Sequence, residues 1–125
     1  MAKSRTSEFV EHLLDLLVPM GGVTARGMFG GWGFYYGGKM FALVAMETFY
    51  VKADATSLAE FKALGLAPFT YPGRDGERTV MSYRTVPPDA LESSHFLIEW
   101  AQKGIEAAER AAVKKPKAAR KRKGD

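Results

Sequence analysis

One stretch of the sequence has the spacing of a phosphate-binding loop. Four residues separate Gly33 from Gly38 and Lys39, the pattern in which loop amides and a lysine hold a nucleotide's phosphates. Such a loop also needs Ser or Thr at the next position, to bind magnesium, and a helix whose first amides face the phosphate. Met40 occupies the Ser/Thr position, and strand-forming residues follow it. We therefore interpret this stretch as a glycine-rich hairpin.

Two histidines are the candidate metal ligands. His12 and His95 fall in different segments of helical periodicity, and neither has a second histidine at ligand spacing. The chain has no cysteine, which excludes thiolate metal sites, disulfides and a cysteine nucleophile. We therefore expect no metal and no cofactor.

Candidate catalytic groups are also sparse. Ser82 lacks the glycine-flanked turn that presents a hydrolase nucleophile. Glu47, Asp54 and Glu60 lie near expected turns and a helix start, where carboxylates commonly cap backbone amides. No acid–base pair follows from these positions, so we predict no catalytic residue and no enzymatic activity.

Basic and aromatic side chains alternate through the middle of the chain. Such residues on an open sheet could stack single-stranded bases. The RNA-recognition signature fails, however, because Met28 stands where an aromatic residue is required after Arg26 and Gly27. The alternative is that the aromatic rings fill the core and its rim while cationic stems cover apolar surface. The residues concerned are Arg26, Lys39, Lys52, Trp32, Tyr35, Tyr36 and Tyr50.

Charge is concentrated at the C-terminus. Residues 114–125 carry seven basic residues and one acid, a net charge of +6, whereas the remaining 11 basic and 13 acidic residues give −2. The segment has no large apolar residue, so we expect a disordered tail. A Lys/Ala/Pro-rich arm of this kind neutralises phosphates and binds DNA without sequence preference. The predicted nucleic-acid-binding residues are Lys114, Lys115, Lys117, Arg120, Lys121, Arg122 and Lys123.

A solubilising terminus is the alternative role for this tail. A membrane-surface role is disfavoured because the tail has no Trp, Phe or Leu. No apolar run in the chain approaches the roughly 20 residues that span a bilayer, and the N-terminus lacks an apolar signal segment. We expect a cytoplasmic protein of one domain, with residues 1–113 as the folded body and residues 114–125 as the tail.

Hydrophobic periodicity predicts the elements that must position these residues. A helix is expected over residues 6–18, three or four strands over 23–52 and a short helix over 55–65. Every residue from Met40 to Met46 is apolar, so we expect a central strand covered on both faces. Ser57 and Glu60 have capping-box spacing at the start of the short helix.

The second half of the chain predicts two strands and the longest helix. An edge strand is expected over 68–71 and another strand over 79–85, in which alternation puts Val80 and Arg84 opposite Tyr83. The helix should open at Pro87–Asp89 and fade near Val113. Its expected apolar stripe consists of Leu97, Ala101, Gly104 and Ala108 at helical spacing. Because helices do not alternate regularly with strands, the fold class is α+β with a mainly antiparallel sheet.

Five short blocks, in this order, resemble the N-terminal domain of the TfoX/Sxy family, bacterial proteins linked to natural competence. The resemblance runs from about Phe9 to Ala108. The blocks are Arg26-x-Met28-Phe29-Gly30-Gly31, Met40-Phe41-Ala42-Leu43-Val44, Tyr50-x-Lys52-x-Asp54, Pro68-Phe69-x-Tyr71, and Met81-Ser82-Tyr83 followed by Pro87.

The resemblance implies a two-layer fold similar to secretion-chaperone-like domains, and a regulatory setting. Two-domain members carry a second, helical domain, whereas this sequence continues into the basic tail. If a surface of the body is functional, the family-matching Arg26, Tyr50, Lys52 and Tyr83 are its expected residues.

These observations lead to a function hypothesis with two alternatives. We expect a non-enzymatic regulatory binding module, a transcription or competence-related regulator that binds a protein partner such as a transcription factor and contacts DNA through the tail. The first alternative is a protein-interaction or homodimeric assembly domain without DNA binding. The second is a small ligand-binding protein or enzyme, which would need a concave site gathering Arg26, Tyr83 and a carboxylate.

Overall fold

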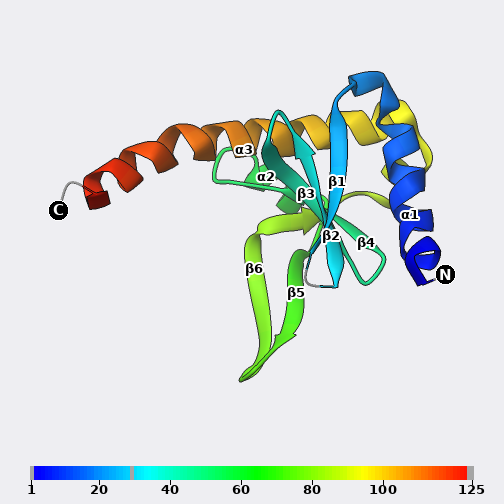
Figure 1. Cartoon of the computed structure of the whole chain (residues 1–125), viewed down its shortest axis with the longest axis horizontal. Helices are drawn as coiled ribbons and strands as arrows, with labels where there is room; N and C mark the ends of the chain where they lie inside the picture. The colour runs from blue at the N-terminus through cyan, green and yellow to red at the C-terminus, as the bar shows by residue number, and fades with distance from the viewer. Residues whose placement is uncertain (1, 29, 124–125) are drawn as a thin grey trace.

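The computed structural model describes the backbone of residues 2–28 and 30–123, and the side chains of residues 8–28 and 30–113. Figure 1 shows a single sheet crossed by one long helix. In chain order the elements are α1 (Ala2–Leu16), the 3-10 helix η1 (Val18–Met20), β1 (Val23–Met28), β2 (Gly31–Tyr36), β3 (Lys39–Ala45), β4 (Thr48–Lys52), α2 (Leu58–Ala63), β5 (Pro68–Gly73), β6 (Gly76–Thr85), the 3-10 helix η2 (Pro88–Glu92) and α3 (Ser94–Lys123).

The sheet has six antiparallel strands in the order β1-β2-β3-β4-β6-β5. Strands β1 to β4 form a meander, and α2 lies in the connection that brings the β5–β6 hairpin to the edge of β4. Gly37 and Gly38, both at positive φ, form the two-residue turn between β2 and β3. The α+β class and the mainly antiparallel sheet predicted from the sequence are confirmed.

The main core lies between one face of the sheet and helices α1, α2 and α3. Phe34, Phe41 and Phe49 are fully buried there, and the Phe34 ring meets the other two edge-to-face at centroid distances of 6.5 and 5.5 Å. Phe41 belongs to β3, the third strand of six, and Leu43 on its opposite face is also buried. The prediction of a central strand covered on both faces is confirmed.

Helix α3 lies against β3 and β4 along a stripe of small residues. Ala101, Gly104 and Ala108 are buried at helical spacing in this stripe, as the sequence predicts. A Cβ atom on Gly104 would lie 2.6 Å from both the Phe41 carbonyl oxygen and a Val51 methyl group. The helix backbone therefore comes closer to the sheet than any residue with a side chain would permit.

An ion pair joins α3 to the loop before α2. The guanidinium of Arg110 donates two hydrogen bonds to the Asp54 carboxylate, at 2.7 and 2.9 Å. This hydrogen bonding, supported by the amide and hydroxyl of Ser57, lowers the pKa of Asp54 from 3.8 to about 2. The expected capping box is therefore wrong: Ser57 bonds back to Asp54, and Glu60 pairs with Lys103 on α3.

Strand β6 departs from the predicted alternation. Pro68 and Phe69 are adjacent in β5, yet they pair with Arg84 and Val80, so residues 81–83 form a bulge. A bulge with extra residues changes which side chains share a face. Val80 and Tyr83 therefore contact the same apolar cluster, while Arg84 is buried on the other side and donates to the Leu66 carbonyl.

The ends of the long helix also differ from expectation. Residues 88–92 form η2, and α3 begins only at Ser94, where the Ser93 hydroxyl accepts the Phe96 amide hydrogen. At its other end α3 continues to Lys123 rather than fading near Val113. Ala, Lys and Arg are strong helix formers and extend a helix that has already formed, although Pro116 within this segment has no amide hydrogen to donate to the helix.

Gly104→Ala should destabilise the protein, although the same change in an exposed helix stabilises. The added methyl group forces α3 away from β3 and β4, and overpacking of this kind costs about 1–3 kcal/mol in the free energy of unfolding. Urea denaturation would measure it. The control is Gly27→Ala, where a Cβ meets no atom within 4 Å. Equal stability of the Gly104 variant and the wild type would contradict the close packing.

Asp54→Asn should destabilise the protein at neutral pH and cease to do so in acid. Because the folded pKa lies below the unfolded value, the stabilisation is complete above about pH 3.8 and lost as the pH falls towards about 2. Melting temperatures of both proteins across this range would test it, with Glu60→Gln as the control for the more exposed pair with Lys103. A difference that persists below pH 2 would contradict the assignment.

Candidate functional site

The sheet face opposite α3 carries the four residues that the family resemblance singles out. Tyr50 and Tyr83 are buried there in a small cluster with Leu43, and the ammonium of Lys52 lies 5.2 Å from the centre of the Tyr83 ring. Arg26 lies on the same face, with its guanidinium 5.0 Å from the centre of the Tyr35 ring. The structure thus brings together residues of β1, β4 and β6. Below, this surface is called the concave face.

The bulge in β6 folds the β5–β6 hairpin towards this face. The Phe69 ring lies 4.9 Å from that of Tyr50 and stacks on Tyr71 at 5.6 Å. Val80, opposite Phe69 in the ladder, packs on the same cluster. The β5–β6 hairpin, which forms one edge of the sheet, is therefore folded over the concave face.

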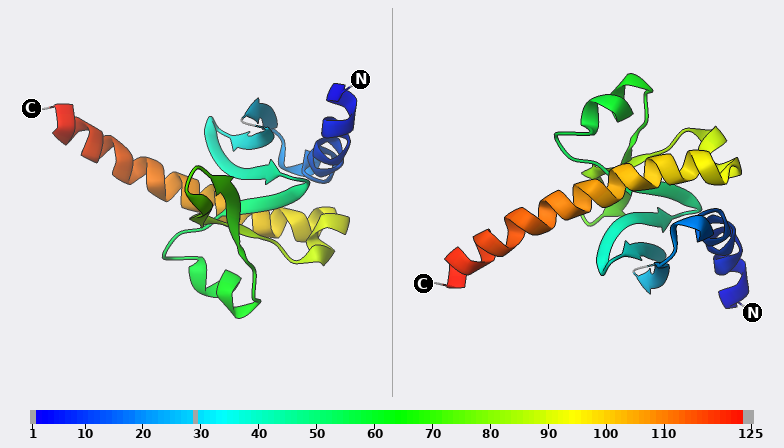
Figure 2. Two further views of the ribbon diagram at one scale, coloured as in Figure 1. Left: turned by 90° about the horizontal axis from the view of Figure 1, so that it is seen from below. Right: turned by 90° about the horizontal axis from the view of Figure 1, so that it is seen from above.

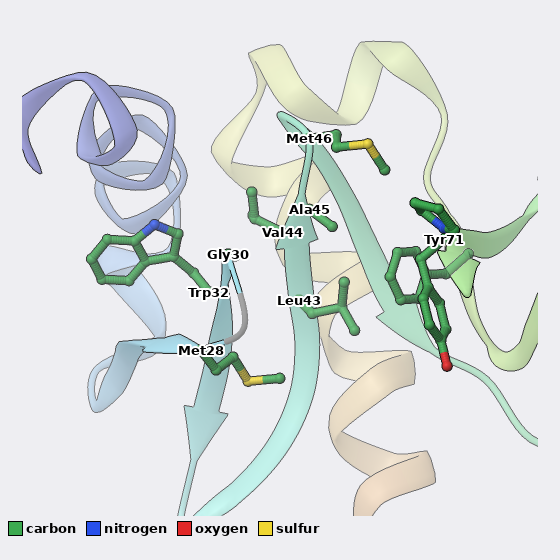
Figure 3. Close-up of a pocket in the computed structure, with 11 residues that line it drawn as sticks. Met28, Gly30, Trp32, Leu43, Val44, Ala45, Met46 and Tyr71 are labelled. Carbon is green, nitrogen blue, oxygen red and sulfur yellow. The ribbon is translucent and has the colours of Figure 1, made fainter. Parts of the chain in front are cut away.

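An apolar groove of about 630 Å³ runs beside this cluster (Figure 3). Its walls come from β1 and β5, which are the two edge strands of the sheet, so the sheet must be strongly curled. The volume falls in the usual range of ligand pockets. The groove is lined by Met28, Gly30, Gly31, Trp32, Leu43, Val44, Ala45, Met46, Phe69, Tyr71 and Pro72.

The mouth of the groove exposes apolar side chains. Met46 is 68% exposed and Tyr71 is 39% exposed. Met46 and Glu47 form the two-residue turn between β3 and β4 with φ of 50° and 59°, a conformation usually left to Gly, Asn or Asp. The turn is therefore strained, and it places a long apolar side chain where solvent would favour a polar one.

The groove chemistry suits binding and offers no acid–base pair. Tyr71 carries the only ionisable side chain among the lining residues. Methionine side chains are flexible and polarisable, so Met28 and Met46 can adapt to apolar groups of different shape. The groove can therefore hold apolar side chains but supplies no general acid, base or nucleophile pair.

The charged residues of the concave face are cations. Arg26 lies two residues before Met28 on the same side of β1, and Arg78 pairs with Tyr71 across the hairpin. Lys52 completes the set. Among the described strand positions whose register directs them to this face, none is Asp or Glu. The face is thus positive on a body whose net charge is −2.

Burial alters the acidity of Tyr83. Removal from water disfavours the charged phenolate and raises the pKa of Tyr83 from 10.0 to about 12, and the phenol of Tyr35 adds to the rise. Tyr35 lies on β2 and Tyr83 on β6, with two strands between them in the sheet.

The remaining sequence candidates take structural positions. The His12 imidazole donates from Nε2 to the Leu91 carbonyl at 2.8 Å, which ties α1 to η2, and the exposed His95 lies 3.4 Å from Glu99. Ser82 is exposed in the bulge. Gly33 to Lys39 belong to the β2–β3 hairpin, which confirms the hairpin interpretation. Across the part of the chain that the structure describes, no group of three His, Cys or carboxylate residues could hold a metal.

The predicted DNA-binding residues Lys114 to Lys123 lie on the last part of α3. The structure does not describe the side chains of these residues, so their role in binding DNA stays a prediction. Within the described backbone, no helix combines the length and hydrophobicity that crossing a membrane requires.

The sequence pattern does not predict the groove. It predicts an edge strand that contains Phe69 and Tyr71, and a central strand that ends at Met46. The available signal was the β3–β4 turn, where Met46 and Glu47 replace the Gly or Asn that such a turn favours. The folding of the hairpin over the face depends on the bulge, which alternation cannot show.

Comparison with known protein families gives a match. A family model described as the TfoX N-terminal domain matches residues 15–108 of the 125 residues. The match includes the four strands of the meander, the groove and the small-residue stripe of α3. No curated protein matches the chain.

Tyr83→Phe should make the protein more resistant to alkali. Because the folded pKa exceeds the unfolded value, stability due to the neutral phenol is complete below about pH 10 and lost as the pH rises towards about 12. Phenylalanine cannot ionise, so this loss should disappear. Melting temperatures through this range would test it, with Tyr71→Phe as the control at a more exposed tyrosine. Identical alkaline profiles for wild type and Tyr83→Phe would contradict the burial argument.

Proposed function

The chain belongs to the TfoX N-terminal domain family, and we propose that it is a non-enzymatic regulatory binding module that contacts DNA through the basic end of α3. The family suggests a regulatory, competence-related role. The folded body would bind a protein partner, and the helix end would hold the pair near DNA. The protein would act in the cytoplasm, where a transcriptional regulator meets its target.

One observation carries the DNA proposal: the basic segment continues α3 beyond the body. Figures 1 and 2 show the last turns of the helix projecting past the sheet. Seven of the 18 basic residues lie from Lys114 onward, with no acid before Asp125. A helix that leaves a body of net charge −2 separates this charge from the acidic residues that would otherwise compete with phosphate.

The expected chemistry is release of counterions from DNA. Each lysine or arginine that neutralises a phosphate displaces condensed cations, which gives affinity that falls steeply with salt and does not depend on base sequence. Base readout would require side chains placed against base edges in a groove. The basic segment therefore supports retention near DNA, with the choice of target left to the protein partner.

The groove supports the second candidate, a protein-interaction or homodimeric assembly domain without DNA binding. Its exposed apolar mouth is a feature of interaction surfaces. This candidate differs from the first in one consequence, because a complex formed through the body would not depend on the charges of residues 114–123.

Neutralising the basic segment should abolish DNA binding. We expect the full chain to bind labelled duplex DNA with a slope of log affinity against log salt of up to about −6, since each neutralised phosphate contributes about −0.9. A full-length variant with glutamine at all seven basic positions from Lys114 to Lys123 should lose this binding, as should a chain ending at Val113.

The matched control changes as many charges on the body and leaves the segment intact. Glutamine at Arg26, Lys39, Lys52, Lys62, Arg74, Arg78 and Lys103 should retain most of the affinity. Circular dichroism would verify that each variant is folded. Equal DNA binding by the wild type and the tail variant would reject the role of the segment and favour the assembly domain.

A further inference from the structure

We propose that the concave face binds an acidic amphipathic segment of a protein partner, whose apolar side chains enter the groove while its carboxylates meet Arg26 and Arg78. This inference identifies the partner surface of the regulatory module proposed above and rests on that proposal. It differs from the DNA proposal in its site and in the charge of its ligand.

The apolar part of the ligand follows from the groove. Its floor is Leu43 and Ala45 of β3, and its walls are Met28 on one side and Phe69 and Tyr71 on the other. Figure 3 shows the side chains of Met28, Leu43 and Tyr71, which come from three different strands, around one open space. Water in such a space makes few hydrogen bonds, so replacing it with aliphatic or aromatic side chains is favourable.

The turn between β3 and β4 supports a binding role for the groove mouth. Met46 holds φ of 50° and exposes 68% of its surface, which disfavours it on both conformational and solvation grounds. Glycine would remove the strain, and a polar residue would suit the exposure. A ligand that covers Met46 would remove the unfavourable exposure of this side chain to water and replace it with an apolar contact.

The acidic part of the ligand follows from the charge of the same face. Arg26 adjoins Met28 along β1, and Arg78 adjoins Tyr71 across the hairpin, so cations flank both walls of the groove. Strand positions directed to this face hold no Asp or Glu within the described residues. An acidic ligand is attracted and a basic one repelled, which gives charge selectivity as well as a faster encounter.

The aromatic residues argue against single-stranded nucleic acid as the ligand. Base stacking requires open ring faces. Tyr50 and Tyr83 are only 9% and 8% exposed, and Arg26 lies over the Tyr35 ring. The apolar groove lies beside these rings and carries no cation among its own lining residues, whereas a nucleic acid would need phosphate contacts along its path.

The test uses the full chain, labelled with ¹³C at its methionine methyl groups, and a synthetic acidic amphipathic peptide. In this helical peptide Leu and Phe recur every three or four residues, with Glu and Asp between them. The chain has six methionines, of which Met28 and Met46 line the groove while the 56% exposed Met81 does not. Peptide binding should shift the Met28 and Met46 signals and leave Met81 unchanged.

Three further ligands separate the groove from general charge attraction. A scrambled peptide of the same composition measures electrostatic binding to the basic end of α3, and a peptide with Lys in place of Glu reverses the charge. A single-stranded oligonucleotide tests the alternative class of ligand. Each titration is repeated on the full-length variant with a neutralised segment, in which the groove signals should still respond to the acidic peptide.

Matched variants assign the binding to named residues. Met46→Gly relieves the turn and removes the side chain from the mouth, so it should weaken peptide affinity about five-fold without loss of stability. Glu47→Gly relieves the same turn, keeps Met46 and removes a negative charge beside the groove mouth, so it should bind the acidic peptide at least as tightly as the wild type does. Arg26→Glu combined with Arg78→Glu should weaken affinity about ten-fold, while Lys62→Glu on the exposed surface of α2 should not.

The outcomes separate this inference from the DNA proposal. Failure of the acidic peptide to shift Met28 and Met46 at millimolar concentration, or an equal response to the scrambled peptide, overturns the inference. So does a stronger response of these signals to the oligonucleotide. If the groove binds the peptide while the basic segment fails to bind DNA, peptide binding at the concave face is supported and the DNA proposal is rejected. If the basic segment binds DNA while the groove does not bind the peptide, the DNA proposal is supported and the peptide proposal is rejected.

Discussion

The close approach of α3 to β3 and β4 is the constraint on which the rest of the structure depends. Gly104 lets the helix backbone come within contact of the Phe41 carbonyl and the Val51 side chain, and Ala101 and Ala108 continue the same narrow stripe. The buried Phe34, Phe41 and Phe49 rings pack edge-to-face with one another in the core between the sheet and the helices. Dispersion contacts fall off quickly with distance, so this packing fixes the helix position closely.

Fixing α3 has consequences at both ends of the molecule. The Asp54–Arg110 pair holds the helix to the loop before α2, shortly before the basic segment begins. The direction of that segment is therefore set by the core rather than by its own charges. Because the helices cover one face of the sheet, the other face is open to the β5–β6 hairpin and to the ligand that we propose.

The concave face combines a small buried cluster and an open groove in one layer of side chains. Tyr50, Tyr83 and Phe69 close a small core where the hairpin folds over the sheet, and the same fold leaves the groove beside it. Cations remain on this surface while the body as a whole is slightly acidic. The two positively charged regions thus differ in composition: an apolar groove with cations at its margins, and a helix end whose sequence has no large apolar residue.

The sequence by itself determined the elements and the class of fold. Glycine pairs located the β2–β3 hairpin, the apolar run of β3 indicated a strand covered on both faces, and small residues at helical spacing marked the stripe of α3. Five ordered blocks indicated the family, and four of their residues lie on the concave face. These signals are local, because turn conformation and side-chain periodicity depend on residues close along the chain.

Only the tertiary structure decided how the open face is built. The bulge at residues 81–83 reversed the faces of β6, since a shift in register depends on the partner strand and not on the alternation within one strand. Ser57 bonded to Asp54 because Arg110 and Lys103, more than 40 residues away, hold the two carboxylates that flank the turn. The groove joins the two edge strands, and their approach follows from sheet curvature, which no single segment of sequence specifies.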